Sequence, residues 1–353
     1  MENRIKGSII CSALGDALGA PHELRTKSGV YTGRLQYTTT ITRRFHSSII
    51  LPSGAVTDDT QMTFALLQSL IRNKSFNKSD VILSYMEWAN RKPDCLGVNT
   101  RMLFRNIKTL RGYESRKKKL NENNQSIGSL MRVSALAFLP LSLSDTELRE
   151  IIDTDTKITN LHNNNLVCNI VHVMLIRGCL QNKSKVELFE MALNFTEEFK
   201  DIAPEACSAI LQALHNEVRC LCNVIIPDVD VDANTTTKIK LKNDEQVKPV
   251  PRLKNDKGWV CHGIYCSVLG LFHFETPYSA IDAIIRMGGD TDTNAKIAGD
   301  LLGAYYGFDV LNSSLSGCSE EQSLHNITLL LQVNEELTNI DETVHSVCNL
   351  FNL

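Results

Sequence analysis

Apolar side chains recur along most of the chain at spacings of three and four residues, the period of an α-helix with one buried face. Strand-like alternation is scarce, and its candidates are residues 29–51 and the short run 238–241. We therefore predict an all-α protein. The predicted helices cover residues 5–19, 60–72, 79–90, 99–110, 129–138, 145–152, 165–181, 186–195, 205–221, 259–272, 278–287, 293–306, 322–335 and 341–350.

The helical pattern is interrupted once at length. Residues 223–256 are polar, carry three prolines and show no helical period, which predicts a long loop or insertion between two core helices. The chain has 353 residues, 43% of them apolar, so we expect one domain over residues 1–353. Amphipathic spacing near the C-terminus predicts a helical cover over about 311–353. We favour a cover over a dimer face and expect a monomer.

Charge and cysteine usage exclude several classes of protein. The net charge of −3 gives no signal for nucleic-acid binding, and the basic run 116–119 lies among acids and amides, as a solvated loop or helix end does. The eleven cysteines form neither a zinc-ribbon nor a disulfide pattern, which indicates a reducing compartment. Without a signal peptide or an apolar run of membrane-spanning length, we expect an intracellular, cytoplasmic protein with no membrane segment.

Small residues recur every four positions in two of the predicted helices. Residues at this spacing lie along one helix face, where small side chains let a neighbouring helix approach closely. Each glycine costs a helix up to about 1 kcal/mol relative to alanine, so the clustering indicates a packing reason. The first row is Gly7, Cys11, Gly15 and Gly19, and the second is Ala295, Gly299, Gly303 and Gly307.

Two segments place carboxylates and hydroxyls directly before a helix: 54–60 (GAVTDDT) and 288–293 (GGDTDT). Helix capping is an alternative for either segment alone, because Asp and Thr are preferred N-cap residues. Residues 153–156 repeat the letters DTDT without a Gly-Gly lead, and we interpret that copy as an ordinary turn. Together the two segments offer four carboxylates, a donor set that suits Mg²⁺ or Mn²⁺.

The order of several motifs resembles the ADP-ribosylglycohydrolases over about residues 5–310. This family includes dinitrogenase reductase-activating glycohydrolase and the ADP-ribosylarginine and ADP-ribosylserine hydrolases. The motifs are 15–23 (GDALGAPHE), 57–60 (TDDT), 131–133 (MRV), 159–162 (TNLH), 258–260 (GWV), 288–293 (GGDTDT) and 298–307 (AGDLLGAYYG).

The resemblance implies an orthogonal multi-helix bundle with two central Mg²⁺ or Mn²⁺ ions that bind the ribose hydroxyls. Matching metal ligands are Thr57, Asp58, Asp59, Asp290, Asp292 and Thr293. Matching substrate-binding positions are Gly128, Ser129, Met131, His162, Gly288 and Gly289. We assign Asp59 or Asp292 to position the attacking water and Glu23 to donate a proton or gate the site.

The expected function is metal-dependent hydrolysis of the glycosidic bond between ADP-ribose and a protein side chain or small acceptor. The transition state of such a cleavage has oxocarbenium character, which nearby carboxylates stabilise. The alternative is a non-catalytic family member that binds ADP-ribose or has a structural role.

Some positions depart from the family pattern or allow two interpretations. Ile127 stands where the family has an asparagine, and Asp94 lies in a segment one residue longer than usual. Asp16 is either a partner of a metal ligand, which we favour, or a buried structural acid. Arg132 could form a structural ion pair or contact substrate, and His162 could line the pocket or cap a helix.

Overall fold

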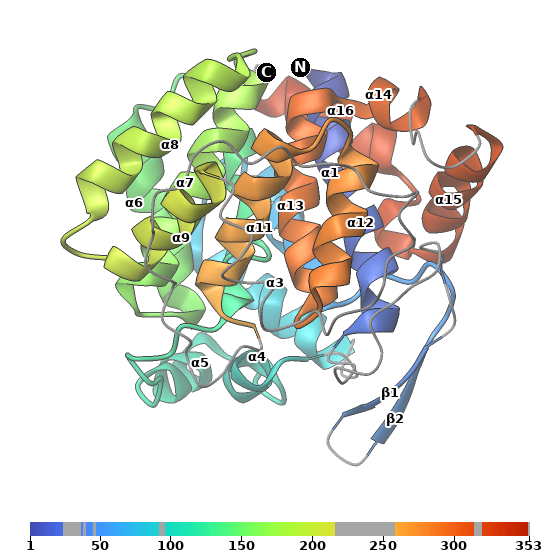
Figure 1. Ribbon diagram of the computed structural model, residues 1–353. Coiled ribbons are helices and arrows are strands. Elements are labelled where there is room, and N and C mark those ends of the chain that lie inside the picture. Colours follow the sequence, from blue (N-terminus) through green and yellow to red (C-terminus); the bar gives the residue numbers. More distant parts are fainter. Residues whose placement is uncertain are drawn as a thin grey trace.

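Helices form nearly all the regular structure in the computed structural model, which describes residues 1–23, 37, 40–44, 47–91, 96–215, 258–313 and 320–351 (Figure 1). The chain is therefore all-α, as predicted. The α-helices are α1 (Glu2–Gly19), α2 (Asp58–Asn73), α3 (Lys78–Arg91), α4 (Val98–Phe104), α5 (Leu110–Lys117), α6 (Asp145–Thr159), α7 (Asn163–Leu180), α8 (Lys185–Phe199), α9 (Pro204–Leu214), α11 (Val260–His273), α12 (Pro277–Met287), α13 (Thr291–Tyr306), α14 (Phe308–Ser313), α15 (Glu320–Val333) and α16 (Ile340–Phe351).

Short elements connect and extend these helices. The 3-10 helices are η1 (Ala20–His22), η3 (Ile127–Ser129), η4 (Val133–Phe138) and η5 (Glu335–Leu337). Within the strand candidate 29–51, β1 (Thr40–Arg44) and β2 (Ser47–Leu51) form an antiparallel hairpin that pairs Thr40 with Leu51. The hairpin projects from the lower end of the bundle (Figure 1). The second strand candidate, 238–241, and the predicted loop at 223–256 lie outside the described residues.

The two small-residue rows pack against each other and make α1 and α13 the central pair of the bundle. A Cβ added at Gly303 would overlap the carbonyl oxygen of Gly7, and one at Gly15 would overlap the carbonyl of Ala295. The helices run antiparallel, so the last turn of α1 lies beside the first turn of α13. The packing reason predicted for the glycines is confirmed.

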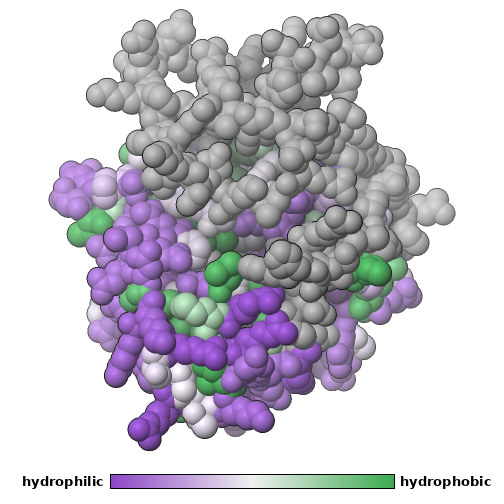
Figure 2. All heavy atoms as spheres, turned by 90° about the horizontal axis from the view of Figure 1, so that it is seen from below, coloured by the Kyte–Doolittle hydropathy of each residue, from purple (hydrophilic) through white to green (hydrophobic). Residues whose placement is uncertain are grey.

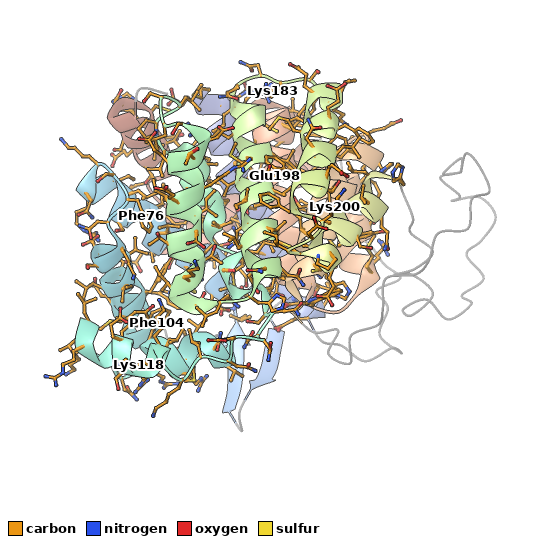
Figure 3. All side chains as sticks on the ribbon, turned by 90° about the vertical axis from the view of Figure 1, so that its left-hand side faces the viewer. Phe76, Phe104, Lys118, Lys183, Glu198 and Lys200 are labelled. Atoms are coloured by element: carbon orange, nitrogen blue, oxygen red, sulfur yellow. The ribbon has the colours of Figure 1, made fainter. Side chains whose placement is uncertain are left out.

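Further helices surround this pair on several sides. Helices α7, α11 and α12 pack on α13, and α9 packs on α11. Helices α14, α15 and α16 contact α1, so the C-terminal segment lies against the central pair. Figure 3 shows α6 to α9 as a layer on the side of the bundle, with Lys183 at one end of the molecule and Lys118 at the other.

Several predicted helices differ from the structure in type or extent. The helix predicted over 99–110 ends at Phe104, where Arg105 turns to an extended backbone, and α5 begins separately at Leu110 behind the N-cap Thr109. The apolar run 129–138 forms parts of η3 and η4 rather than an α-helix. The apolar pattern of residues 129–138 did not predict the type of helix, because this run is buried on all sides by several elements.

The interpretation of residues 153–156 as a turn is wrong, because they lie inside α6. The predicted capping box is present: the Ser144 hydroxyl accepts the Glu147 N–H, and the Glu147 carboxylate accepts the Ser144 N–H. The helix then continues through the repeat because Asp155 and Thr156 are buried against the core, whereas Asp153 pairs with Lys157 on the outer face.

The lower face of the molecule shows the polarity of part of the described surface (Figure 2). Seen from below, the described surface is mainly hydrophilic, with small separated apolar patches (Figure 2). No helix in the described part of the chain combines the length and apolarity needed to cross a bilayer.

The α1–α13 contact predicts a large stability cost for Gly303→Ala. The added methyl group would overlap the backbone of α1, which cannot move aside as a side chain can, so we expect a loss of about 1–3 kcal/mol or more in urea denaturation. Gly270→Ala in α11 is the matched control. Its Cβ would find neighbours no closer than 3.5 Å, and alanine favours the helix. Equal stability of the Gly303 variant and wild type would contradict the packing argument.

Candidate metal centre

The first acidic segment is held at the start of α2 by a network of hydrogen bonds. Thr57 is the N-cap, and its hydroxyl lies 2.9 Å from Asp59 Oδ2. The Asp16 carboxylate on α1 accepts the Thr57 N–H at 3.0 Å, the Thr60 N–H at 3.2 Å and the Thr60 hydroxyl at 2.6 Å. Asp16 therefore caps α2 from another helix and sets the position of the segment.

The second acidic segment begins α13 and is held by α1 from the other side. The Thr291 hydroxyl donates to the Gly19 carbonyl at 2.8 Å, and a Cβ at Gly19 would meet the Asp292 backbone. The Thr293 hydroxyl lies 2.9 Å from Asp290 Oδ1. Both segments thus take their positions from the last two turns of α1.

These contacts bring the acidic side chains into two overlapping groups. Oxygens of Asp16, Asp59 and Asp292 lie within 4.8 Å of one another, and so do oxygens of Glu23, Asp290 and Asp292. Asp292 belongs to both groups and lies between them. Asp58 belongs to neither: it lies in the adjacent cavity wall, where Oδ2 accepts the Gly97 N–H at 3.2 Å.

Burial and mutual repulsion make the carboxylates hard to ionise. Burial and then the charge of Asp59 raise the pKa of Asp16 to about 7 and that of Asp290 to about 7, with Glu23 adding to the effect on Asp290. For Asp292, burial and the charges of Glu23, Asp290, Asp59 and Asp16 raise the pKa well above its usual value.

This donor set fits a divalent cation. Clustered carboxylates that raise one another's pKa are stabilised when positive charge enters between them. The ligands are carboxylate and hydroxyl oxygens, which hard ions such as Mg²⁺ and Mn²⁺ prefer. Two groups that share Asp292 could hold two ions side by side.

A cavity of about 470 Å³ opens beside the acidic groups. Its size is within the range of small-molecule sites in proteins. Part of its lining is acidic, and the neutral part comes from α4 and the residues before it, the 126–131 loop and Gly258. The lining residues are Glu23, Asp58, Asp59, Leu96, Gly97, Val98, Asn99, Thr100, Asn124, Ser126, Ile127, Gly128, Met131, Gly258, Asp290, Asp292 and Thr293.

Gly258 joins the neutral and acidic sides. Its carbonyl accepts the Ile127 N–H at 2.7 Å, and its φ of +69° is the left-handed conformation that glycine adopts without strain. A Cβ there would lie 2.8 Å from Asp290 Oδ2. The loop and the second acidic segment are therefore fixed to the same backbone position.

Ile127 has a packing role where the family pattern suggested a polar contact. It borders the cavity but is buried, and a Cβ at Gly263 of α11 would lie 2.6 Å from its Cδ1. The isoleucine side chain therefore fills space beside α11, and the loop is held by its backbone N–H.

The six residues expected to bind substrate are not all in the cavity wall. Gly128 and Met131 line it. Ser129 is fully buried behind it, and Gly288 and Gly289 form the turn between α12 and Asp290. His162 is the N-cap of α7, where Nδ1 accepts the Asn164 N–H at 3.1 Å. The capping interpretation of His162 agrees with this contact.

Arg132 forms the structural ion pair that was one of its two interpretations. Nη2 lies 3.2 Å from Asp155 Oδ2, and both side chains are fully buried. Arg132 does not border the cavity, although its neighbour Met131 does.

The role of residues Leu96 to Thr100 in the cavity wall was not predicted from the sequence. The segment that contains it was noticed for Asp94, which lies outside the described residues. Reasoning also missed Gln125, whose Oε1 accepts from Trp259 Nε1 at 2.8 Å and from Asn164 Nδ2 at 2.9 Å. Only the GWV and TNLH motifs pointed toward these supporting contacts, since the amide itself has no local signature.

Comparisons with known proteins agree with the geometry. A family model described as ADP-ribosylglycohydrolase matches residues 1–342. The ADP-ribosylhydrolase ARH3 of Mus musculus is 26% identical over 359 residues, covering 92% of this chain and 92% of that protein. ARH3 of Bos taurus is 24% identical over 358 residues, covering 92% and 93%.

A solved structure supports the same fold. It is described as an ADP-ribosylglycohydrolase-related protein complex, and it superposes with a TM-score of 0.66 over 99% of this chain and 98% of its own, at 18% sequence identity. The resemblance seen in the order of the motifs is confirmed by the family match, which covers most of the sequence. The chain belongs to the ADP-ribosylglycohydrolase family.

Proposed function

We propose that this protein hydrolyses the glycosidic bond that links ADP-ribose to a modified side chain or small acceptor, using two Mg²⁺ or Mn²⁺ ions. The observation that carries the proposal is the shared position of Asp292 between two acidic groups at the edge of a cavity. Family membership supports the glycohydrolase activity, and the acidic groups support the metal dependence.

The proposed ligands are Thr57, Asp58, Asp59, Asp290, Asp292 and Thr293. When bound, a pair of divalent ions supplies positive charge that orients the ribose hydroxyls beside the scissile bond. Asp16 serves the same site indirectly, because its carboxylate is occupied by three donors from the start of α2.

Hydrolysis breaks the bond between the anomeric carbon and the acceptor, adds the hydroxyl of water to that carbon and returns a proton to the acceptor. Asp59 or Asp292 accepts the proton of the attacking water. Glu23, which follows η1 and lies half-buried at the cavity, donates a proton to the leaving acceptor or gates the opening. Carboxylates around the ring also stabilise the oxocarbenium character of the transition state.

The neutral side of the cavity is proposed to hold the rest of ADP-ribose. The 126–131 loop would contact the diphosphate and adenosine through Gly128 and Met131, with Ser129 buried behind them. Gly288, Gly289 and His162 complete the proposed substrate set, in the turn before α13 and at the start of α7.

Calorimetry of ADP-ribose binding with and without Mg²⁺ tests the metal-dependent site. We expect binding that weakens strongly when the ion is removed with a chelator. Release of ADP-ribose from arginine-, serine- and nucleotide-linked conjugates, followed in parallel, then identifies the acceptor. Binding without turnover on every conjugate would instead support the non-catalytic alternative.

Asp292→Asn should remove both hydrolysis and stabilisation by metal, because one substitution weakens both acidic groups. We expect a rate loss of at least about a hundredfold, on the scale of losing a general base, and no Mn²⁺-dependent rise in melting temperature. Asp153→Asn is the matched control, since it lies in the other DTDT sequence but on the outer face of α6. A fully active Asp292 variant would exclude the assigned role.

The raised pKa of Asp290 predicts a pH dependence of metal-free stability. Its folded-state pKa of about 7 exceeds the usual value of 3.8, so the folded protein binds the extra proton between these values. This protonation stabilises the folded protein relative to the unfolded chain below about pH 4, and the stabilisation is lost as the pH rises through 7. Asp290→Asn should therefore stabilise the metal-free protein at pH 8, on the order of 4 kcal/mol, with little effect at pH 4. Thermal unfolding in chelator at both pH values measures this, and a destabilised variant at pH 8 would contradict it.

A further inference from the structure

Arg132 is a fully buried cation behind the cavity wall. Nη1 donates to the Gly128 carbonyl at 2.7 Å and to the Thr159 hydroxyl at 2.8 Å, and Nη2 donates to the Asp155 carbonyl at 2.9 Å. The guanidinium also lies 5.0 Å from the centre of the Tyr85 ring. One planar side chain therefore connects the cavity loop to α6 and α3.

Aromatic packing fixes this cation in place. The Tyr85 hydroxyl donates to Asp155 Oδ1 at 3.2 Å, and its ring packs 5.6 Å from Phe104. Phe104 in turn stacks on Tyr113, whose hydroxyl donates to the Ile158 carbonyl at 2.9 Å. Figure 3 marks Phe104 between the lower end of α6 and the layer of α4 and α5. The guanidinium is thus held by α3 and α6, and α4 and α5 support these two helices through Phe104 and Tyr113.

Neutral groups hold the rest of the 126–131 loop. Asn160 and Asn165 donate to the Ser126 carbonyl at 3.0 and 2.8 Å, and the Thr63 hydroxyl lies 3.2 Å from the Met131 carbonyl. Of the contacts described for this loop, only the one at Gly128 uses a charged side chain. A hydrogen bond from a charged donor is about twice as strong as a neutral one.

Gly128 is the position of the loop that most needs such a restraint. It lines the cavity, and a Cβ there would meet nothing within 4 Å, so no packing limits the backbone on that side. Glycine also has more backbone freedom than any other residue. Without a donor behind it, the peptide that follows Gly128 could rotate and turn its carbonyl oxygen into the cavity.

We propose that Arg132 is a positioning residue that keeps the Gly128 carbonyl turned away from the cavity and so keeps that wall open to an anionic diphosphate. A carbonyl oxygen is the negative end of the peptide dipole, and facing a diphosphate it would repel the ligand. Arg132 thereby controls nucleotide affinity without touching the nucleotide. The effect on nucleotide affinity rests on the proposed function, whereas the orientation of the Gly128 peptide does not.

Arg132→Lys tests the inference, with Arg177→Lys as the matched control. Lysine keeps the charge but lacks the planar fork that reaches Gly128, Thr159 and Asp155 together. Arg177 is also buried and donates to the carbonyls of Leu139 and Pro140 at 2.8 and 2.6 Å, but neither residue lines the cavity. Both variants therefore lose a buried arginine that holds backbone carbonyls.

Amide hydrogen exchange, measured by mass spectrometry on the whole metal-loaded chain, reports how well the backbone of residues 126–131 is protected. We expect faster exchange in residues 126–131 for Arg132→Lys and wild-type exchange there for Arg177→Lys. Calorimetry should show ADP-ribose binding weakened about tenfold by Arg132→Lys, because the loss of one charged hydrogen bond within the protein lets the Gly128 peptide leave the orientation that admits the ligand. Mn²⁺ affinity should stay at the wild-type value, and kcat should change far less than KM.

Each alternative outcome overturns a defined part of the inference. Unchanged exchange in 126–131, or an equal change in the Arg177 variant, excludes the positioning role. Faster exchange with unchanged ADP-ribose affinity excludes its effect on the nucleotide. If wild type itself binds no ADP-ribose, the proposed function fails, while the exchange result still decides the positioning role.

Tyr85→Phe provides a milder second variant should Arg132→Lys not fold. It keeps the ring beside the guanidinium and removes only the hydroxyl that holds Asp155. The same changes in exchange and ADP-ribose affinity are expected, with smaller size, and wild-type values for both would overturn the inference.

Discussion

The close contact between α1 and α13 is the constraint on which the rest of the structure depends. Because glycines meet the opposing backbone, the helices have one register in which they can pack. That register places Gly19 against Asp292 and leaves Asp16, one turn earlier, to cap α2. Both acidic segments are thus positioned by the same helix, and the site inherits its geometry from a contact made by residues without functional groups.

The acidic groups are costly to the fold that contains them. Buried carboxylates that raise one another's pKa oppose folding wherever they ionise, and the apolar core around α7, α11 and α13 must offset that cost. Such an arrangement is typical of binding sites, where local stability is given up for affinity. Asp290 and Asp292 differ in this respect from Asp153, which has a similar local sequence but pairs with Lys157 at the surface.

Features that depend on residues close together in sequence could be predicted. Features that depend on residues far apart in sequence could not. Helix periods, the Ser144 capping box and the small-residue rows could be read from the sequence because each depends on neighbours within a few positions. The buried position of Asp155 could not be predicted from the sequence, because its partner Arg132 is distant in the chain and the sequence around Asp155 resembles a turn. The cavity wall from Leu96 to Thr100 was undervalued for the same reason: its role follows from where α4 packs.

The α1–α13 contact also has a consequence for how the chain assembles. The Ser8 hydroxyl donates to the Asp300 carbonyl across 292 positions of sequence. Closing so long a loop is entropically unfavourable and slows folding. During synthesis, α1 is made long before α13, so the contact between these two helices forms late even though α1 can already pack against α2 and α7. Chaperones that shield the glycine face of α1 until α13 is made should therefore influence the yield of this protein more than its final stability.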